Sequence, residues 1–110
     1  MFAKKQRLTK KEFDYIYSVG KRYHSPLIQL IHYPTEVFHG AVVVGKKVYK
    51  KAVKRNKLRR QLYGFLYRRH KKNPLSGSFI FIAKPTIQKA SQDEISESLL
   101  SLIQQVEKNK

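Results

Sequence analysis

Residues 46–72, KKVYKKAVKRNKLRRQLYGFLYRRHKK, are the most basic stretch of this sequence and the one that decides its fold. Thirteen of these 27 residues are Lys or Arg, and none is acidic. The apolar residues recur at i, i+4, i+7 and i+8, the spacing of one core-facing helical stripe: Leu58, Leu62, Phe65 and Leu66. The pattern predicts a long helix that buries this stripe and holds its cations in fixed positions.

The opposite face of the predicted helix is cationic. At about 100° per residue, this face and its flanks carry Asn56, Arg60, Tyr63 and Tyr67, with Arg55 and Arg59 on one side and Lys57 and Arg68 on the other. Lys and Arg exchange condensed counterions for phosphate contacts, and the Arg fork binds phosphate oxygens in pairs. A solvated face usually mixes charges of both signs, whereas no acid occurs between Glu36 and Asp93. The surface therefore favours a polyanionic partner.

The length, composition and net charge limit the classes to which this protein can belong. At 110 residues, 41% of them hydrophobic, the sequence predicts one folded domain with a modest core. The formal net charge of +17 predicts salt-sensitive association with nucleic acid, with an anionic membrane surface as the other physical candidate. No segment approaches the roughly 20 apolar residues of a spanning helix, so we expect a cytoplasmic protein.

The chain is predicted to begin with a flexible basic arm over residues 1–8. A helix follows, because Thr9 and Glu12 have the spacing of a capping box. We expect this helix to reach about residue 19 and to stop at Gly20, which is a favourable C′ residue.

The rest of the sequence predicts a small sheet and a final helix. The expected strands cover residues 21–24, 27–33, 41–45 and 78–83. A second capping box, Ser91 with Glu94, opens a helix with an apolar stripe. We therefore predict a single α+β domain over residues 9–107, in which helices pack on a sheet, and a frayed tail over residues 108–110.

Groups suited to catalysis or metal binding are scarce. The absence of Cys excludes disulfides, thiolate catalysis and the usual zinc frameworks. The four histidines lie without ligand spacing, and several acids are accounted for as helix caps or first-turn residues. We predict no catalytic residue and no metal site in the protein itself.

Two aromatic residues of the first helix allow two interpretations. Phe13 and Tyr17 lie four positions apart and share a helix face with Ile16. They could belong to the core, or they could form a wall on which unpaired bases stack.

At residues 52–60, AVKRNKLRR, the sequence resembles the signature of the bacterial ribonuclease P protein subunit, in which such a run opens a helix after a strand and a Lys-Lys pair. The likeness extends to VGKK at residues 44–47 and to FIFIAKP at residues 79–85. The first helix, with its aromatic residues and closing Gly20, is also similar to that family.

The resemblance implies an αβββαβα two-layer sandwich with a left-handed βαβ crossover, a ribosomal-protein-like RNA-binding fold. It also implies a subunit of the ribonucleoprotein endonuclease that removes the 5′ leader from precursor tRNA. The catalytic RNA would perform the hydrolysis with Mg²⁺ bound mainly through that RNA. The implied partners are this RNA and precursor tRNA, without a membrane or DNA.

The resemblance also assigns residue roles. The residues implied to contact RNA are Arg55, Asn56, Lys57, Arg59 and Arg60, together with Lys46 and Lys47. The residues implied to line the cleft for the single-stranded leader are Phe13, Tyr17 and Ile31. Tyr63 stands where the family often has Arg, so we expect it to stack or donate a hydrogen bond from an exposed face.

Other RNA- and DNA-binding functions compete with this hypothesis. A ribosomal protein on a related α+β fold would explain the charge equally well, but it gives no reason for the RNK and Arg-Arg run. A protein that recognises double-stranded DNA is less favoured, although the residues of the exposed helix face do not distinguish a DNA target from an RNA target. A nuclease acting without RNA would need a carboxylate cluster, which the sequence does not show.

Overall fold

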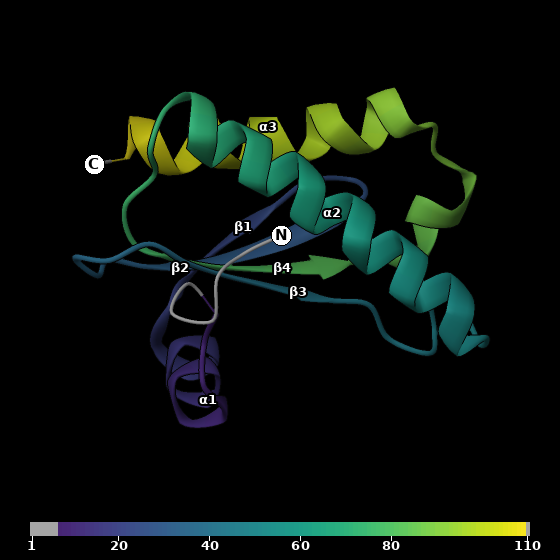
Figure 1. The fold of residues 1–110 in the computed structure, drawn as a ribbon, viewed down its shortest axis with the longest axis horizontal. Coiled ribbons are helices and arrows are strands. Elements are labelled where there is room, and N and C mark those ends of the chain that lie inside the picture. The colour runs from purple at the N-terminus through teal and green to yellow at the C-terminus, as the bar shows by residue number, and fades with distance from the viewer. Residues whose placement is uncertain (1–6, 110) are drawn as a thin grey trace.

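The computed structural model describes residues 7–109 as three α-helices around a four-stranded sheet (Figure 1). The elements in chain order are α1 (Lys10–Val19), β1 (Lys21–His24), β2 (Ile28–Tyr33), β3 (His39–Val43), α2 (Ala52–Lys72), β4 (Ser78–Ala83), the 3₁₀ helix η2 (Pro85–Lys89) and α3 (Gln92–Lys108). The predicted αβββαβα order is confirmed. The 3₁₀ helix is an addition that the sequence analysis did not predict.

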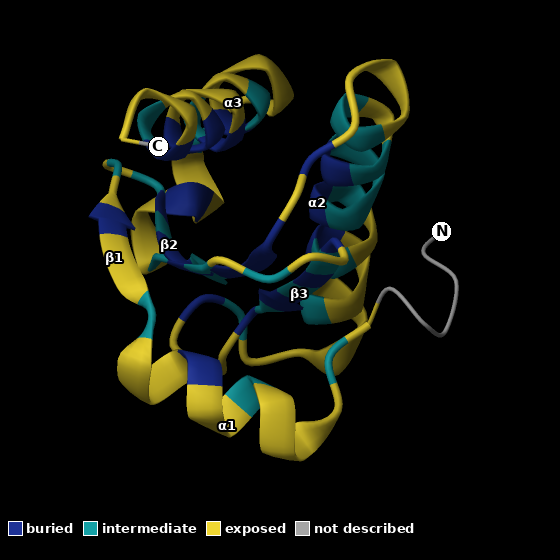
Figure 2. Cartoon of the chain, turned by 90° about the vertical axis from the view of Figure 1, so that its left-hand side faces the viewer, coloured by how far each residue is buried: buried dark blue, intermediate teal, exposed yellow. Residues whose placement is uncertain are grey.

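The sheet has the strand order β1-β2-β4-β3. β2 pairs antiparallel with β1 and β4, whereas β3 runs parallel to β4 at the edge. α2 connects β3 to β4 by crossing the sheet as a left-handed connection (Figures 1 and 2). This confirms the handedness implied by the family resemblance, against the general preference for right-handed crossovers.

The helices are divided unequally between the two faces of the sheet (Figure 2). α2 and α3 cover one face, where the larger core cluster includes Phe79, Phe81 and the buried stripe of α3. Among the described helices, α1 is the one on the other face, where it packs over a smaller cluster of Ile16, Ile31 and Ile80. Because one short helix cannot cover four strands, part of this second face stays accessible.

Both predicted capping boxes are present. At the start of α1, the Thr9 N–H donates to the Glu12 carboxylate at 2.9 Å, and the Glu12 N–H donates to Thr9 Oγ1 at 3.2 Å. Ser91 and Glu94 repeat the arrangement at the start of α3. The side chain of each Glu is thereby used to begin a helix, as the sequence predicted.

Gly20 ends α1 for a different reason from the one predicted. Its φ of −67° is ordinary extended backbone, not the left-handed conformation of a C′ glycine. A Cβ atom at this position would lie 2.5 Å from Ile31 Cγ2 and 2.7 Å from the Ile16 carbonyl oxygen. Glycine is therefore required by the close approach of α1 to β2.

The predicted basic arm lies mostly outside the described residues. Arg7 forms an isolated parallel bridge with Gly40, and Leu8 packs against the cluster beneath α1. At the other end, α3 extends to Lys108, and the Asn109 N–H donates to the Val106 carbonyl oxygen at 3.2 Å. The division into arm, domain and tail stays a prediction.

Candidate nucleic-acid interface

The basic helix α2 is anchored by three buried leucines. Leu58, Leu62 and Leu66 are 5%, 0% and 0% exposed, which confirms most of the predicted stripe. Phe65 is half-buried at the edge of the larger core, and the Arg68 guanidinium lies over its ring, 5.2 Å from the centroid. The helix is thus fixed to the body of the protein along one side.

The N-terminal turns of α2 present an exposed cationic surface. Asn56, Lys57 and Arg60 are exposed, and Arg59 is half-buried beside them. In the described part of the chain no side chain caps the start of α2, and its first turn contains no acid. Cations near the positive end of a helix dipole repel one another and the dipole. A bound anion would relieve this repulsion and accept hydrogen bonds from the N-terminal amides.

Arg55 fixes the loop that precedes the helix. Its Nη1 donates to the carbonyl oxygens of Tyr49 at 3.0 Å and Lys50 at 2.7 Å, and the side chain is half-buried. The loop is also held by Gln88, whose amide donates to the Val48 carbonyl oxygen. Arg55, predicted as an RNA contact, therefore has a positioning role in the structure.

Lys46 and Lys47 are exposed in the turn that follows β3. The Val48 N–H donates to the Gly45 carbonyl oxygen at 3.1 Å, which closes this turn. Figure 1 shows β3 leading through the loop into the start of α2. The two lysines therefore belong to the segment that joins β3 to the cationic helix start.

The predicted exposure of Tyr63 and Tyr67 is wrong. Both side chains are half-buried and pack against the larger core. The Tyr63 hydroxyl accepts a hydrogen bond from the Val42 N–H at 3.1 Å. α2 contacts both α3 and β3, so its buried arc is wider than the single apolar stripe from which exposure was inferred.

On the opposite face of the sheet, α1 carries a pair of stacked rings. Phe13 and Tyr17 have centroids 6.0 Å apart and an interplanar angle of 23°. Phe13 is half-buried against the α1 cluster, whereas Tyr17 is 43% exposed. The Arg22 guanidinium lies 4.9 Å from the Tyr17 centroid and donates to the Tyr17 carbonyl oxygen at 3.0 Å. An aromatic surface with an adjacent cation suits an unpaired base and its phosphate.

Ile31 was predicted to line this surface, and that prediction is wrong. Its side chain is 0% exposed because α1 packs directly over β2, with Gly20 against Ile31. Four sheet residues stay half-buried around the same cluster, Tyr33 at the end of β2 together with Ala41, Val43 and Ile82. The last three belong to β3 and β4, on the side of the sheet that α1 leaves more open.

Burial alternates along β3, and Val43 is one of its half-buried residues. The sequence AVVV is apolar at every position, so it gives no alternation from which the exposure of Val43 could be predicted. Arg22 was also missed by the sequence analysis. Its proximity to Tyr17 depends on how β1 follows α1, and the sequence carried no motif for it.

Two carboxylates, Glu12 and Glu94, have the electrostatics of helix caps. Hydrogen bonds from the Thr9 backbone and side chain hold the pKa of Glu12 below its ordinary value, and Ser91 does the same to the pKa of Glu94. A general acid needs the opposite shift. Across residues 7–109, no group of three or more His, Cys, Asp or Glu could hold a metal ion. Within the same range, none of the helices could cross a membrane.

The chain is similar to proteins of one bacterial family. A family model for ribonuclease P matches residues 2–107. The ribonuclease P protein component of Nitratiruptor sp. is 32% identical over 102 residues, covering 93% of this chain and 92% of that protein. The ribonuclease P protein component of Synechococcus sp. is 34% identical over 106 residues, with 84% of each covered.

The fold also has a close structural counterpart. A Staphylococcus aureus RNase P protein mutant with defective mRNA degradation activity matches with a TM-score of 0.84 at 24% identity, covering 94% of this chain and 90% of that chain. At this level of identity the likeness supports the fold.

Proposed function

This chain belongs to the ribonuclease P protein family, and from that membership we propose how its surfaces serve the enzyme. As a ribonuclease P protein component, it is a subunit of the endoribonuclease that matures the 5′ end of tRNA. In the proposed division of labour, the RNA subunit performs the hydrolysis. The protein binds that RNA through the start of α2 and the 5′ leader of precursor tRNA through the α1 face.

The observation that carries the first part is the exposed cationic start of α2. Asn56, Lys57 and Arg60 are exposed on consecutive turns of a helix that the core holds rigidly. Lys46 and Lys47 extend this surface into the preceding turn. Cations on a rigid helix bind phosphates with less loss of backbone entropy than cations on a mobile segment. The surface therefore suits the backbone of a folded RNA.

The second part rests on the stacked rings of α1. Tyr17 offers an exposed ring to a base, Phe13 supports that ring, and Arg22 supplies a cation for the adjoining phosphate. Because mature tRNA lacks a leader, only the precursor would gain these contacts. The protein would then favour the substrate over the product by differential binding.

Mg²⁺ enters this proposal as a ligand of the RNA. The described residues of the protein do not offer a cluster of carboxylates and imidazoles that fits a metal site. The cations of α2 would instead position RNA phosphates. By screening phosphate repulsion, they would let the RNA fold and bind substrate at lower Mg²⁺ concentrations.

The test is cleavage of a 5′-extended precursor tRNA at low Mg²⁺ by a bacterial ribonuclease P RNA alone, by the protein alone and by both together. We expect cleavage at the mature 5′ end in the mixture, well above either component alone. Cleavage by the protein alone would contradict the proposed division of labour. An inactive mixture would leave the ribosomal-type RNA-binding function as the better explanation.

Two variants separate the proposed surfaces. Arg60→Ala should weaken RNA binding and reduce the slope of log affinity against log salt by roughly one unit. Phe13→Ala should mainly reduce the preference for precursor over mature tRNA. An unchanged slope in the first variant or an unchanged preference in the second would remove that surface from the proposal.

A further inference from the structure

A second cationic surface lies between the C-terminal half of α2 and α3. A groove of about 650 Å³ separates the two helices there, with Phe65, Arg68 and Lys72 on the α2 side and Leu100 and Glu107 on the α3 side. It lies on the sheet face opposite α1, because α2 and α3 both cover that face (Figure 2). The residues proposed above to contact RNA do not line it.

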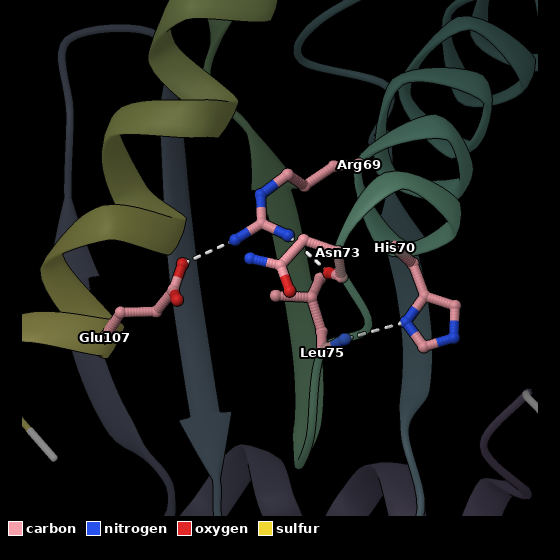
Figure 3. Close-up of polar contacts among 5 residues, drawn as sticks. All are labelled: Arg69, His70, Asn73, Leu75 and Glu107. Carbon is pink, nitrogen blue, oxygen red and sulfur yellow. Dashed lines mark hydrogen bonds and ion pairs between the residues drawn. The ribbon is translucent and has the colours of Figure 1, made fainter.

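One end of the groove is held by a polar clamp (Figure 3). Arg69 Nη2 lies 2.6 Å from Glu107 Oε1, and Arg69 Nη1 donates to the Asn73 carbonyl oxygen at 2.5 Å. On the other side of α2, the Leu75 N–H donates to His70 Nδ1 at 3.0 Å. The end of α2 is therefore tied both to α3 and to the segment leading into β4, so the groove has a fixed width here.

The ion pair of the clamp also leaves the groove with a net positive charge. Arg69 pairs with Glu107, the acid among the lining residues, which leaves the exposed side chains of Arg68 and Lys72 as positive charge at the rim. The groove is also lined by two apolar side chains, the Phe65 ring of α2, over which the Arg68 guanidinium lies, and the 37% exposed Leu100 of α3. Apolar surface beside rim cations suits a nucleotide, whose base packs on the former while its phosphate meets the latter.

We propose that this α2–α3 groove binds a single-stranded segment of the ribonuclease P RNA. The inference rests on the proposed function, which supplies the RNA partner. The RNA subunit is favoured over the precursor tRNA because the leader surface of α1 lies on the other face of the sheet. The protein would thus contact the RNA subunit at two places, the start of α2 and the α2–α3 groove.

Because the sequence contains no cysteine, one introduced thiol can carry a cross-linking probe at a single chosen position. Gln104→Cys places a unique thiol in the groove, and Ser101→Cys places one on another side of α3, in a depression that Pro26 and Leu27 also line. Both positions are exposed, so neither variant disturbs the core. Each thiol is coupled to an azidophenacyl group and irradiated with a bacterial ribonuclease P RNA, with and without precursor tRNA.

We expect the probe at residue 104 to cross-link the ribonuclease P RNA several times more than the probe at residue 101, with or without precursor tRNA. Equal yields from the two probes would overturn the inference. Cross-linking to precursor tRNA alone would also overturn it. The absence of any RNA adduct at residue 104 would do the same and would indicate a protein partner for the groove.

Affinity measurements give a second criterion. Arg68→Ala should weaken binding of ribonuclease P RNA about fivefold and flatten its salt dependence by roughly one unit. Lys89→Ala removes one exposed cation outside the groove and should change neither. If Arg68→Ala behaves like Lys89→Ala while Arg60→Ala weakens binding, the groove inference fails and the proposed function stands. If the unaltered protein does not bind the RNA, both fail.

Discussion

The Tyr63 hydroxyl accepts a hydrogen bond from the Val42 N–H at 3.1 Å, which joins the middle of α2 to the edge strand β3. An edge strand exposes backbone groups that can pair with other chains. The Tyr63 hydroxyl accepts the hydrogen bond of one of these groups, the Val42 N–H, and thereby also holds α2 over the sheet. Tyr63 therefore has a structural role in the contact between α2 and β3.

Replacing Tyr63 by Phe removes this hydroxyl and keeps the ring. We expect Tyr63→Phe to lower the free energy of unfolding by about 1 kcal/mol, because the part-buried Val42 N–H loses its acceptor. Urea titration followed by circular dichroism would measure the change. RNA affinity should stay the same, and a large loss of affinity without a loss of stability would instead assign the hydroxyl to RNA.

The two exposed tyrosines of α1 form a matched pair for testing base stacking. Tyr17 stacks on Phe13 and is 43% exposed, whereas Tyr15 contacts Tyr33 edge to face and is 55% exposed. Tyr17→Ala should reduce the preference for precursor over mature tRNA about tenfold, as expected for the loss of one base contact.

Tyr15→Ala should leave the preference for precursor unchanged, because Tyr15 is outside the proposed leader surface. Equilibrium binding of both tRNA forms to the assembled enzyme would measure the two ratios. Equal effects of the two substitutions would show that α1 contributes general aromatic surface and not a defined stacking site.

The sequence predicted the elements of the fold well because its local signals agree with the tertiary structure. The capping boxes of Thr9 and Ser91 mark two helix starts, and the apolar periodicity of α3 matches its buried face. The left-handed crossover is different. General chirality rules favour the other hand, so this feature could be expected from the family resemblance and not from local patterns.

The errors concern contacts between elements that are distant in sequence. Ile31 and Val43 are both apolar strand residues, and their exposure differs because α1 packs over β2 and leaves the edge strand β3 more open. Tyr63 faces away from the leucine stripe, but β3 covers that flank of the helix. A helical wheel describes one element alone, so it could not show which second neighbour α2 contacts.

The contact between α1 and β2 predicts a steric effect at Gly20. An alanine Cβ would lie 2.5 Å from Ile31 Cγ2 and 2.7 Å from the Ile16 backbone oxygen, and the backbone atom cannot move without shifting the helix. Gly20→Ala should therefore cost about 1–3 kcal/mol of stability. Gly45→Ala is the control, because among residues 7–109, apart from Gly45 and its two chain neighbours, no atom lies within 4 Å of the added Cβ. Equal stability of the two variants would contradict the tight α1–β2 contact.

The depressed pKa of Glu12 predicts a pH-dependent contribution to stability. Its carboxylate accepts from the Thr9 N–H, so the pKa lies below 4.5 in the folded state. The contribution is present above the unfolded pKa and is lost as pH falls through the folded pKa. The stability advantage of the wild type over Glu12→Gln should therefore shrink below about pH 4.5.

Thermal unfolding at a series of pH values would measure this difference between wild type and Glu12→Gln. Adding Thr9→Ala should weaken its pH dependence, because the Thr9 hydroxyl also lowers the pKa of Glu12. A difference that stays constant from neutral to acidic pH would show that the capping box does not persist in solution.

The charge distribution predicts that anions stabilise the free protein. The formal charge of +17 is partly concentrated at the start of α2, where no acid offsets the helix dipole. Sulfate that binds there to the folded state, and not to the unfolded chain, must raise the midpoint of thermal unfolding. We expect sulfate to raise it more than chloride at the same ionic strength, and the excess to shrink in Arg60→Ala. Equal midpoints in the two salts would mean that the protein responds to screening alone, without a defined anion site on α2.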